Sequence, residues 1–164
     1  MRFKWVPEPP ATIGQLTAIH RAIPLVPATE STCLQRLVDR ETAIDSREAA
    51  NQWLTFLRAI DAIERTPRGY RRQHTELTAA ELHTRVLDRI YGARELHEVL
   101  AAADQPMDIE TIVDRGADLP TWEQYHHTDH QQVHRRRQRR LAEWFVLCEV
   151  AEKTAPGYRL LDAS

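Results

Sequence analysis

The octapeptide ERTPRGYR at residues 64–71 recurs 88 residues later as EKTAPGYR at residues 152–159. Five of the eight positions are identical, and upstream apolar pairs such as Phe56 and Trp144 fall at the same offset. A helix that buries one face, enters a strand and reverses at a glycine would produce this pattern. The match therefore predicts duplication of one supersecondary unit within the chain.

Outward from the two octapeptides, apolar spacing and capping residues predict a series of helices before the hairpin in each half. The helices of the first half are expected at 12–22, 31–40 and 46–59, followed by a hairpin over 62–72. Those of the second half are expected at 78–91, 93–103, 108–115 and 129–147, with a break at Gly92 and a hairpin over 150–161.

The order helix, helix, turn, helix, hairpin resembles the winged-helix superfamily. Residues 53–65 resemble the end of the third helix and the first wing strand, and residues 66–71 resemble the wing. The resemblance implies a mainly α fold with small β-hairpins and two winged-helix modules in tandem, at 1–76 and 77–164. Residues 31–40 and 46–59 would be the motif helices of the first module, and 108–115 and 129–147 those of the second. Residues 117–128 would be an inserted segment of the second module.

Composition is that of a globular protein, with 42% hydrophobic and 28% charged residues among 164. The net charge is −2, but residues 1–73 hold 11 Lys/Arg against 8 Asp/Glu, and residues 74–164 hold 11 against 16. Attraction to nucleic acid must therefore come from local patches. Cys33 and Cys148 lie among apolar neighbours, which predicts buried thiols in a reducing compartment. With no apolar run of membrane length and no signal sequence, we expect a cytoplasmic protein.

In DNA-binding winged helices the third helix enters the major groove and the wing contacts the backbone, so the resemblance implies double-stranded DNA as a partner. The helix would contribute Ser46, Arg47, Asn51, Gln52 and Thr55, and the wing Arg65, Arg68, Arg71 and Arg72. The alternative is a solvated hairpin on an arginine-rich surface.

A second cationic cluster lies in the helix expected at 129–147, which contains Arg135, Arg136, Arg139 and Arg140. One interpretation is a helix that holds phosphates, and the other is a projecting helix paired with acidic residues of the same half. Arg137 should lie near the buried side of this helix, because Leu141 and Trp144 define that side.

Three histidines, His126, His130 and His134, follow helical spacing that can place metal ligands on one face. No cysteine joins them and Asp129 favours a helix start, so we expect no metal there. Neither a nucleophile elbow nor a phosphate-binding glycine loop is present, which predicts a protein that is not an enzyme and needs no cofactor.

Two functions remain open at this point. The first is a DNA-binding transcriptional regulator. The second is a subunit that binds other proteins within a chromosome-associated or other complex, because tandem winged helices also resemble subunits of this kind. Trp122 and Tyr125 of the insertion would then contact the partner. A protein with either function could act as a homodimer, or the two modules of a single chain could take the place of a homodimer.

Overall fold

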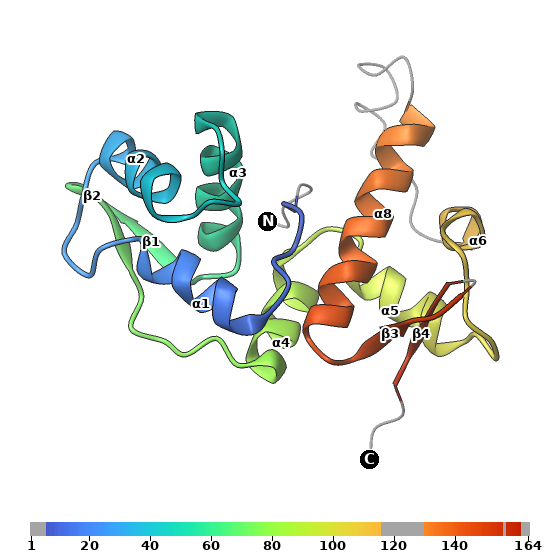
Figure 1. Ribbon diagram of the computed structural model, residues 1–164. Coiled ribbons are helices and arrows are strands. Elements are labelled where there is room, and N and C mark those ends of the chain that lie inside the picture. Colours follow the sequence, from blue (N-terminus) through green and yellow to red (C-terminus); the bar gives the residue numbers. More distant parts are fainter. Residues whose placement is uncertain (1–5, 116–129, 156, 162–164) are drawn as a thin grey trace.

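A computed structural model describes residues 6–115, 130–155 and 157–161 (Figure 1). It is mainly α with two antiparallel hairpins, as predicted. The elements, in chain order, are α1 (Ile13–Arg21), α2 (Glu30–Arg40), α3 (Arg47–Ala59), β1 (Ile63–Thr66), β2 (Gly69–Arg72), α4 (Ala79–Arg89), α5 (Ala93–Ala101), α6 (Ile109–Arg115), α8 (His130–Leu147), β3 (Ala151–Lys153) and β4 (Tyr158–Leu160).

Hydroxyl side chains set the beginnings of four of these helices. Thr12, Thr29, Ser46 and Thr78 have extended backbones, and each side-chain oxygen accepts a hydrogen bond from an amide three residues later. Such caps satisfy a backbone donor that would otherwise have no partner in the first turn. Helix α3 begins directly after its cap, Ser46, as the predicted range 46–59 requires.

The first module comprises α1, α2, α3 and the β1–β2 hairpin, and the second comprises α5, α6, α8 and the β3–β4 hairpin. Each hairpin gains a third, single-residue strand that local sequence patterns do not reveal. Ala28 bridges Tyr70 in the first module, and Met107 bridges Tyr158 in the second. The tyrosines are 88 residues apart, whereas Ala28 and Met107 are 79 apart. The second module therefore has nine more residues than the first between its two bridged positions.

A second repeated detail occurs where each long helix passes into its hairpin. Asp61 and Glu149, 88 residues apart, both adopt a positive φ of about 60°: 58° and 64° respectively. The next amide in each case bonds back to the helix, from Ala62 to Leu57 O and from Val150 to Phe145 O. This is the Schellman way of ending a helix, usually completed by glycine. Its conservation between the halves supports a duplicated unit.

Helix α4 has no counterpart in the first module and joins the two modules instead. Its Arg85 donates hydrogen bonds to the carbonyls of Ile60 and Asp61, each at 3.0 Å, and to Thr75 Oγ1 at 3.2 Å. Arg89 forms an ion pair with Asp61 at 2.5 Å. The buried apolar side chains of both halves form one continuous core. The division at residue 76 remains a prediction, since the packing crosses it.

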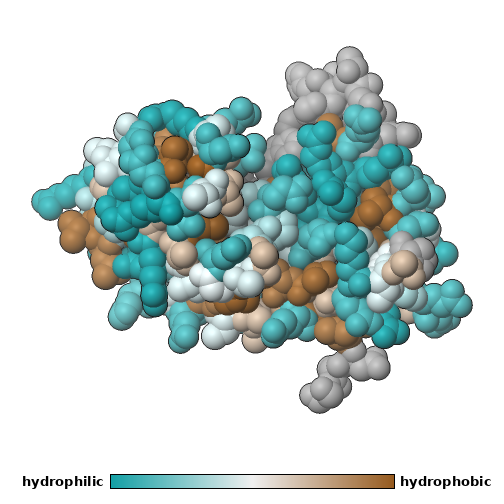
Figure 2. All heavy atoms as spheres, in the orientation of Figure 1, coloured by the Kyte–Doolittle hydropathy of each residue, from teal (hydrophilic) through white to brown (hydrophobic). Residues whose placement is uncertain are grey.

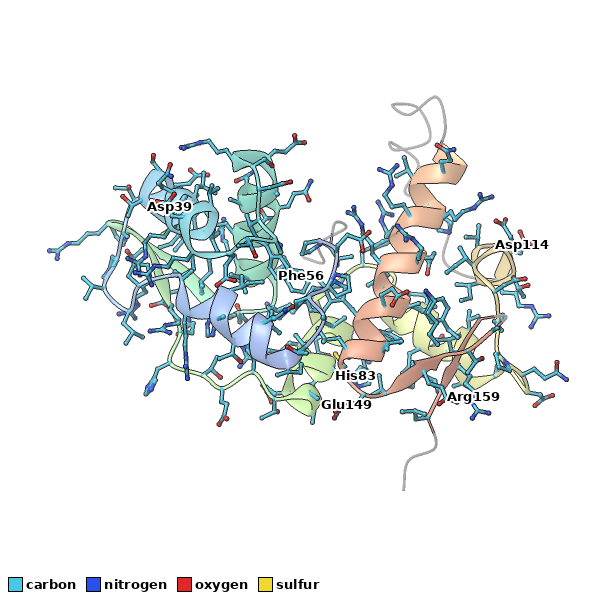
Figure 3. The ribbon with its side chains drawn as sticks, in the orientation of Figure 1. Asp39, Phe56, His83, Asp114, Glu149 and Arg159 are labelled. Atoms are coloured by element: carbon cyan, nitrogen blue, oxygen red, sulfur yellow. The ribbon has the colours of Figure 1, made fainter. Side chains whose placement is uncertain are left out.

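The modules meet through aromatic side chains of α3 and α8. Phe56 and Trp144 stack with ring centroids 4.6 Å apart, and Trp53 meets Trp144 edge-on at 5.9 Å. Figure 3 places Phe56 between these two helices. Because Phe56 and Trp144 are equivalent positions of the repeat, the contact joins a position to its own copy. The same position of each repeat thus contributes to the contact between the two modules.

Candidate nucleic-acid interface

Helix α3 presents a polar face to solvent. Its buried side is apolar, with Ala50, Trp53, Leu54 and Leu57 all in the core. The residues predicted to contact DNA from this helix are exposed and lie on the opposite side, namely Ser46, Arg47, Asn51, Gln52 and Thr55. Two of them make internal contacts: Ser46 Oγ accepts from the Ala49 amide at 3.0 Å, and Arg47 Nη2 donates to Ser31 Oγ at 3.2 Å.

The predicted wing arginines do not all occupy the same environment. Arg65 and Arg68 are exposed near the turn of the β1–β2 hairpin, and no acidic side chain in the described parts of the chain pairs with them. Arg71 forms an ion pair with Glu64 across the hairpin. Arg72 lies opposite the buried Ile63, so it is on the inner side of the hairpin. The structure thus separates Arg65 and Arg68 from Arg72 as candidates for phosphate contact.

The arginines of α8 contact acidic side chains from distant parts of the chain. Arg135 pairs with Glu110 of α6 at 3.0 Å. Arg139 and Arg140 share Glu8 Oε1, at 3.2 and 3.3 Å, and Arg140 also donates to the Val6 carbonyl. The guanidinium groups of these residues are thus arranged around carboxylates, and the role of Glu8 was not expected from the sequence.

Arg137 lies on the buried side of α8, as its place in the helix predicted. It is 2% exposed, and its guanidinium lies over the Tyr91 ring, 6.0 Å from the centroid. Its neighbour Gln138 is also buried. In contrast, Arg136 is exposed. The arginine run therefore divides into the buried Arg137, the partly buried Arg140, whose side chain is 20% exposed, and three exposed members.

Polar residues outside the buried faces of α3 and α8 occupy equivalent positions. At the offset of 88, Asn51 corresponds to Arg139 and Gln52 to Arg140, in addition to the pair Arg47 and Arg135 noted in the sequence. The sequence comparison found the last pair but missed the first two, because neither conserves residue type. The positions become comparable because the two helices bury the same positions of the repeat, such as Phe56 with Trp144 and Leu57 with Phe145.

The second hairpin repeats one feature of the first and differs in another. Glu152 and Arg159 form a cross-strand ion pair at the positions of Glu64 and Arg71. Lys153, however, is paired with Glu143 of α8 at 3.1 Å. Tyr158 also donates to Glu143, at 2.5 Å, and burial together with this carboxylate raises the pKa of the Tyr158 hydroxyl. Both cations of this hairpin, Lys153 and Arg159, are therefore exposed but paired with carboxylates of their own module.

Several predicted contacts lie outside the described residues: Trp122, Tyr125, His126 and the insertion at 117–128. Of the three histidines considered for a metal, only His134 has a described side chain, and it is buried. Within the described ranges, no three His, Cys, Asp or Glu side chains are grouped so that they could hold a metal ion. Cys33 and Cys148 are buried free thiols, as predicted.

A hollow of about 840 Å³ lies at the base of the first hairpin, between α1 and the segment that leads to α4. Its lining includes Arg21, Arg72 and His20. His20 is 4% exposed, and its Nε2 lies 2.7 Å from the Ala62 carbonyl, to which the neutral ring donates. Burial lowers the pKa of His20, and the nearby arginines lower it further.

We expect the stability of the protein to fall as the pH falls below about 6.5, the ordinary pKa of histidine. The folded pKa of His20 is lower than the unfolded one, so the unfolded state binds the extra proton first. The stability is complete above that pH, and one such group contributes a slope of up to about 1.4 kcal/mol per pH unit below it. His83, whose pKa is also lowered by burial, adds to the effect.

Urea unfolding between about pH 7.5 and pH 5 would measure this dependence. His20→Gln is the matched variant, since a glutamine amide can donate to the Ala62 carbonyl but does not titrate. Its stability should depend less on pH than that of the unmodified protein. An unchanged slope in the variant would assign the dependence to other groups.

No helix within the described ranges is both long and apolar enough to cross a membrane. Comparison with known proteins identifies one family: a model described as the halobacterial double winged helix domain matches residues 1–164. No curated protein and no solved structure shows a significant match. The family description agrees with two helix-turn-helix units that each end in a hairpin, and the winged helix is in general a DNA-binding or regulatory type of fold. The chain therefore belongs to the halobacterial double winged helix domain family.

Proposed function

We propose that the protein binds double-stranded DNA and acts as a cytoplasmic transcriptional regulator rather than an enzyme. The observation with most weight is the combination of the exposed polar face of α3 with Arg65 and Arg68 on the adjacent hairpin. In helix-turn-helix proteins the corresponding helix contacts base edges while neighbouring cations contact the backbone. Asn51 and Gln52 have side-chain amides, which can pair with adenine in the major groove.

The net charge of −2 does not oppose this proposal, because the charge is unevenly distributed. Arg135, Arg136 and Arg139 are exposed on α8 and Arg140 is partly exposed, and Figure 2 shows mainly hydrophilic residues on this face of the molecule. The acidic partners of these arginines are themselves about half exposed or more, with 54% for Glu8 and 63% for Glu110. Exposed ion pairs contribute little, so a phosphate can replace a carboxylate at small cost.

Replacing both wing arginines, Arg65→Ala and Arg68→Ala, should weaken DNA binding and reduce its dependence on salt. Each phosphate contact contributes about 0.9 to the slope of log K against log salt, so the double variant should lose roughly 1.8. Near 0.1 M salt the affinity should fall by about tenfold for each arginine. Fluorescence anisotropy of a labelled random duplex, titrated from about 50 to 200 mM salt, gives both quantities.

The matched control removes two arginines of similar exposure from the α4–α5 region, Arg89→Ala and Arg94→Ala. Their partners are Asp61 and Asp88, and their side chains are 49% and 50% exposed. This control should retain the slope of the unmodified protein. If the full chain binds no duplex even at low salt, the DNA-binding proposal is wrong.

Protein binding is the second candidate, and one observation favours it. Leu25 and Val26, in the loop after α1, are 52% and 74% exposed, and Figure 2 shows apolar surface at the edge where this loop runs. Exposed apolar patches often mark contacts with other chains. The absence of DNA binding in the titration would favour this function over the first.

A further inference from the structure

We infer that the two modules have different tasks on the same duplex: α3 contacts base edges, whereas α8 holds phosphates. One chain would then recognise an asymmetric target, with a sequence-specific half and a half bound through its backbone. This inference rests on the proposed DNA binding and specifies the kind of duplex that the site accepts.

The arrangement of the modules allows one chain to engage two adjacent parts of a duplex. The stacked pair Phe56 and Trp144 lies near the C-terminal ends of α3 and α8. From this contact the two helices diverge, and their N-terminal ends point to the same side of the molecule (Figure 1). In helix-turn-helix dimers two recognition helices also project to one side, each into its own groove. Here the aromatic contact within one chain takes the place of a dimer interface.

The chemistry of the two helices differs at equivalent positions. Helix α3 has the uncharged hydrogen-bonding residues Asn51 and Gln52, which can discriminate between bases because each amide has a donor and an acceptor. Helix α8 has Arg139 and Arg140 at these positions. An arginine can contact guanine or phosphate, so residue type alone does not assign its partner.

The contacts of the α8 arginines favour phosphate. Arg139 and Arg140 converge on one carboxylate oxygen of Glu8, and Arg135 contacts the carboxylate of Glu110. The guanidinium groups are therefore positioned around an anion, which a phosphate resembles in charge and in its acceptor oxygens. The edge of guanine offers two neutral acceptors and would not replace the lost carboxylate charge.

The two hairpins differ in how their cations are paired, which supports a division of tasks. In the first module Arg65 and Arg68 are exposed on the hairpin, so this module can contact the backbone without using α3. In the second module the hairpin cations Lys153 and Arg159 are 62% and 57% exposed, but both are paired with carboxylates, those of Glu143 and Glu152. Each module has cations for the backbone, but only the first has uncharged amides, Asn51 and Gln52, at the equivalent positions where α8 has Arg139 and Arg140.

Selection from a pool of duplexes with a randomised centre tests the inference. Bound sequences should share one specific block without an inverted copy, and titration should give one chain per duplex. The variant Asn51→Ala with Gln52→Ala should lose tenfold or more of its preference for the selected duplex over random DNA. Its salt slope should be unchanged.

The paired variant on α8 is Arg136→Ala with Arg139→Ala, two exposed side chains whose removal leaves the core intact. It should bind selected and random duplexes more weakly by the same factor, with the salt slope reduced by about two. Glu8→Gln removes the competing carboxylate charge, so it should tighten binding to both duplexes several-fold and leave the preference unchanged.

The outcomes separate this inference from the underlying proposal. An inverted repeat among the selected sequences, two chains per duplex, or an altered preference in the Arg136 and Arg139 variant would overturn the division of tasks while DNA binding stands. Unchanged affinity in Glu8→Gln would also overturn it. A complete lack of duplex binding by the unmodified chain would overturn both.

Discussion

Replacing Gly69 with alanine should destabilise the protein by roughly 3 kcal/mol or more, through backbone strain and overpacking together. Gly69 has a φ of +125°, which a side chain disfavours. A Cβ at this position would lie 2.1 Å from the Ala28 carbonyl oxygen and 3.0 Å from the Thr29 amide nitrogen. These are backbone atoms, so the hairpin and the Ala28 bridge cannot both keep their places.

Replacing Gly157 with alanine should also destabilise the protein, but through overpacking alone, without the strain of a positive φ. A Cβ there would lie 2.0 Å from the Met107 carbonyl oxygen, the counterpart of Ala28 in the second module. The alanine variant should lose roughly 1–3 kcal/mol, the usual range for overpacking. Comparison of the two variants separates the strain of a positive φ from the close approach of the third strand.

Gly14→Ala is the matched control for both substitutions. Gly14 is exposed within α1, where a new Cβ would have an ordinary contact of 3.7 Å with Thr12 Oγ1. This change should be neutral or should stabilise the protein by up to about 1 kcal/mol, since alanine favours a helix. Urea unfolding measures all three variants. Full stability in Gly69→Ala would show that the hairpin does not lie against residues 28–29.

The sequence predicted the main elements closely, because their signals are local. The prediction of a helix at 46–59 compares with α3 at Arg47–Ala59, and that of 129–147 with α8 at His130–Leu147. Hydroxyl caps, apolar spacing and glycine turns determine such boundaries within a few residues of the chain. The family match confirms the tandem winged-helix fold that the repeated octapeptide indicated.

What the sequence did not reveal depends on contacts between distant residues. The glycines of the octapeptides were interpreted as turn residues, but Gly157 is required by the nearness of Met107, 50 positions earlier. The contact of Glu8 with Arg139 and Arg140 spans more than 130 residues. A run of arginines gives no indication of which members contact carboxylates and which is buried. The predicted DNA-contacting residues stay predictions, since their exposure permits binding without demonstrating it.

Replacing Trp144 with alanine should cost roughly 3–5 kcal/mol and should uncouple the two modules. Trp144 is fully buried, stacks on Phe56 and donates its Nε1–H to the Pro7 carbonyl at 2.8 Å. Trp144→Phe preserves an aromatic ring but removes this donor, so it should lose only about 1–3 kcal/mol. Both values can be measured by urea unfolding, with fluorescence and circular dichroism recorded together.

The same experiment tests whether the chain behaves as one folding unit. Because one core crosses the contact between α3 and α8, the unmodified protein should unfold in one transition that both probes report identically. In Trp144→Ala the probes should separate, since the aromatic contact no longer joins the modules. A double-mutant cycle with Phe56→Ala should give a coupling of about 0.5–1.5 kcal/mol for the stacked pair. A loss below 1 kcal/mol in Trp144→Ala, or zero coupling to Phe56, would mean that the repeat-equivalent aromatic pair does not hold the modules together. The two motif helices would then be free to bind separate sites, and the asymmetric target would lose its structural basis.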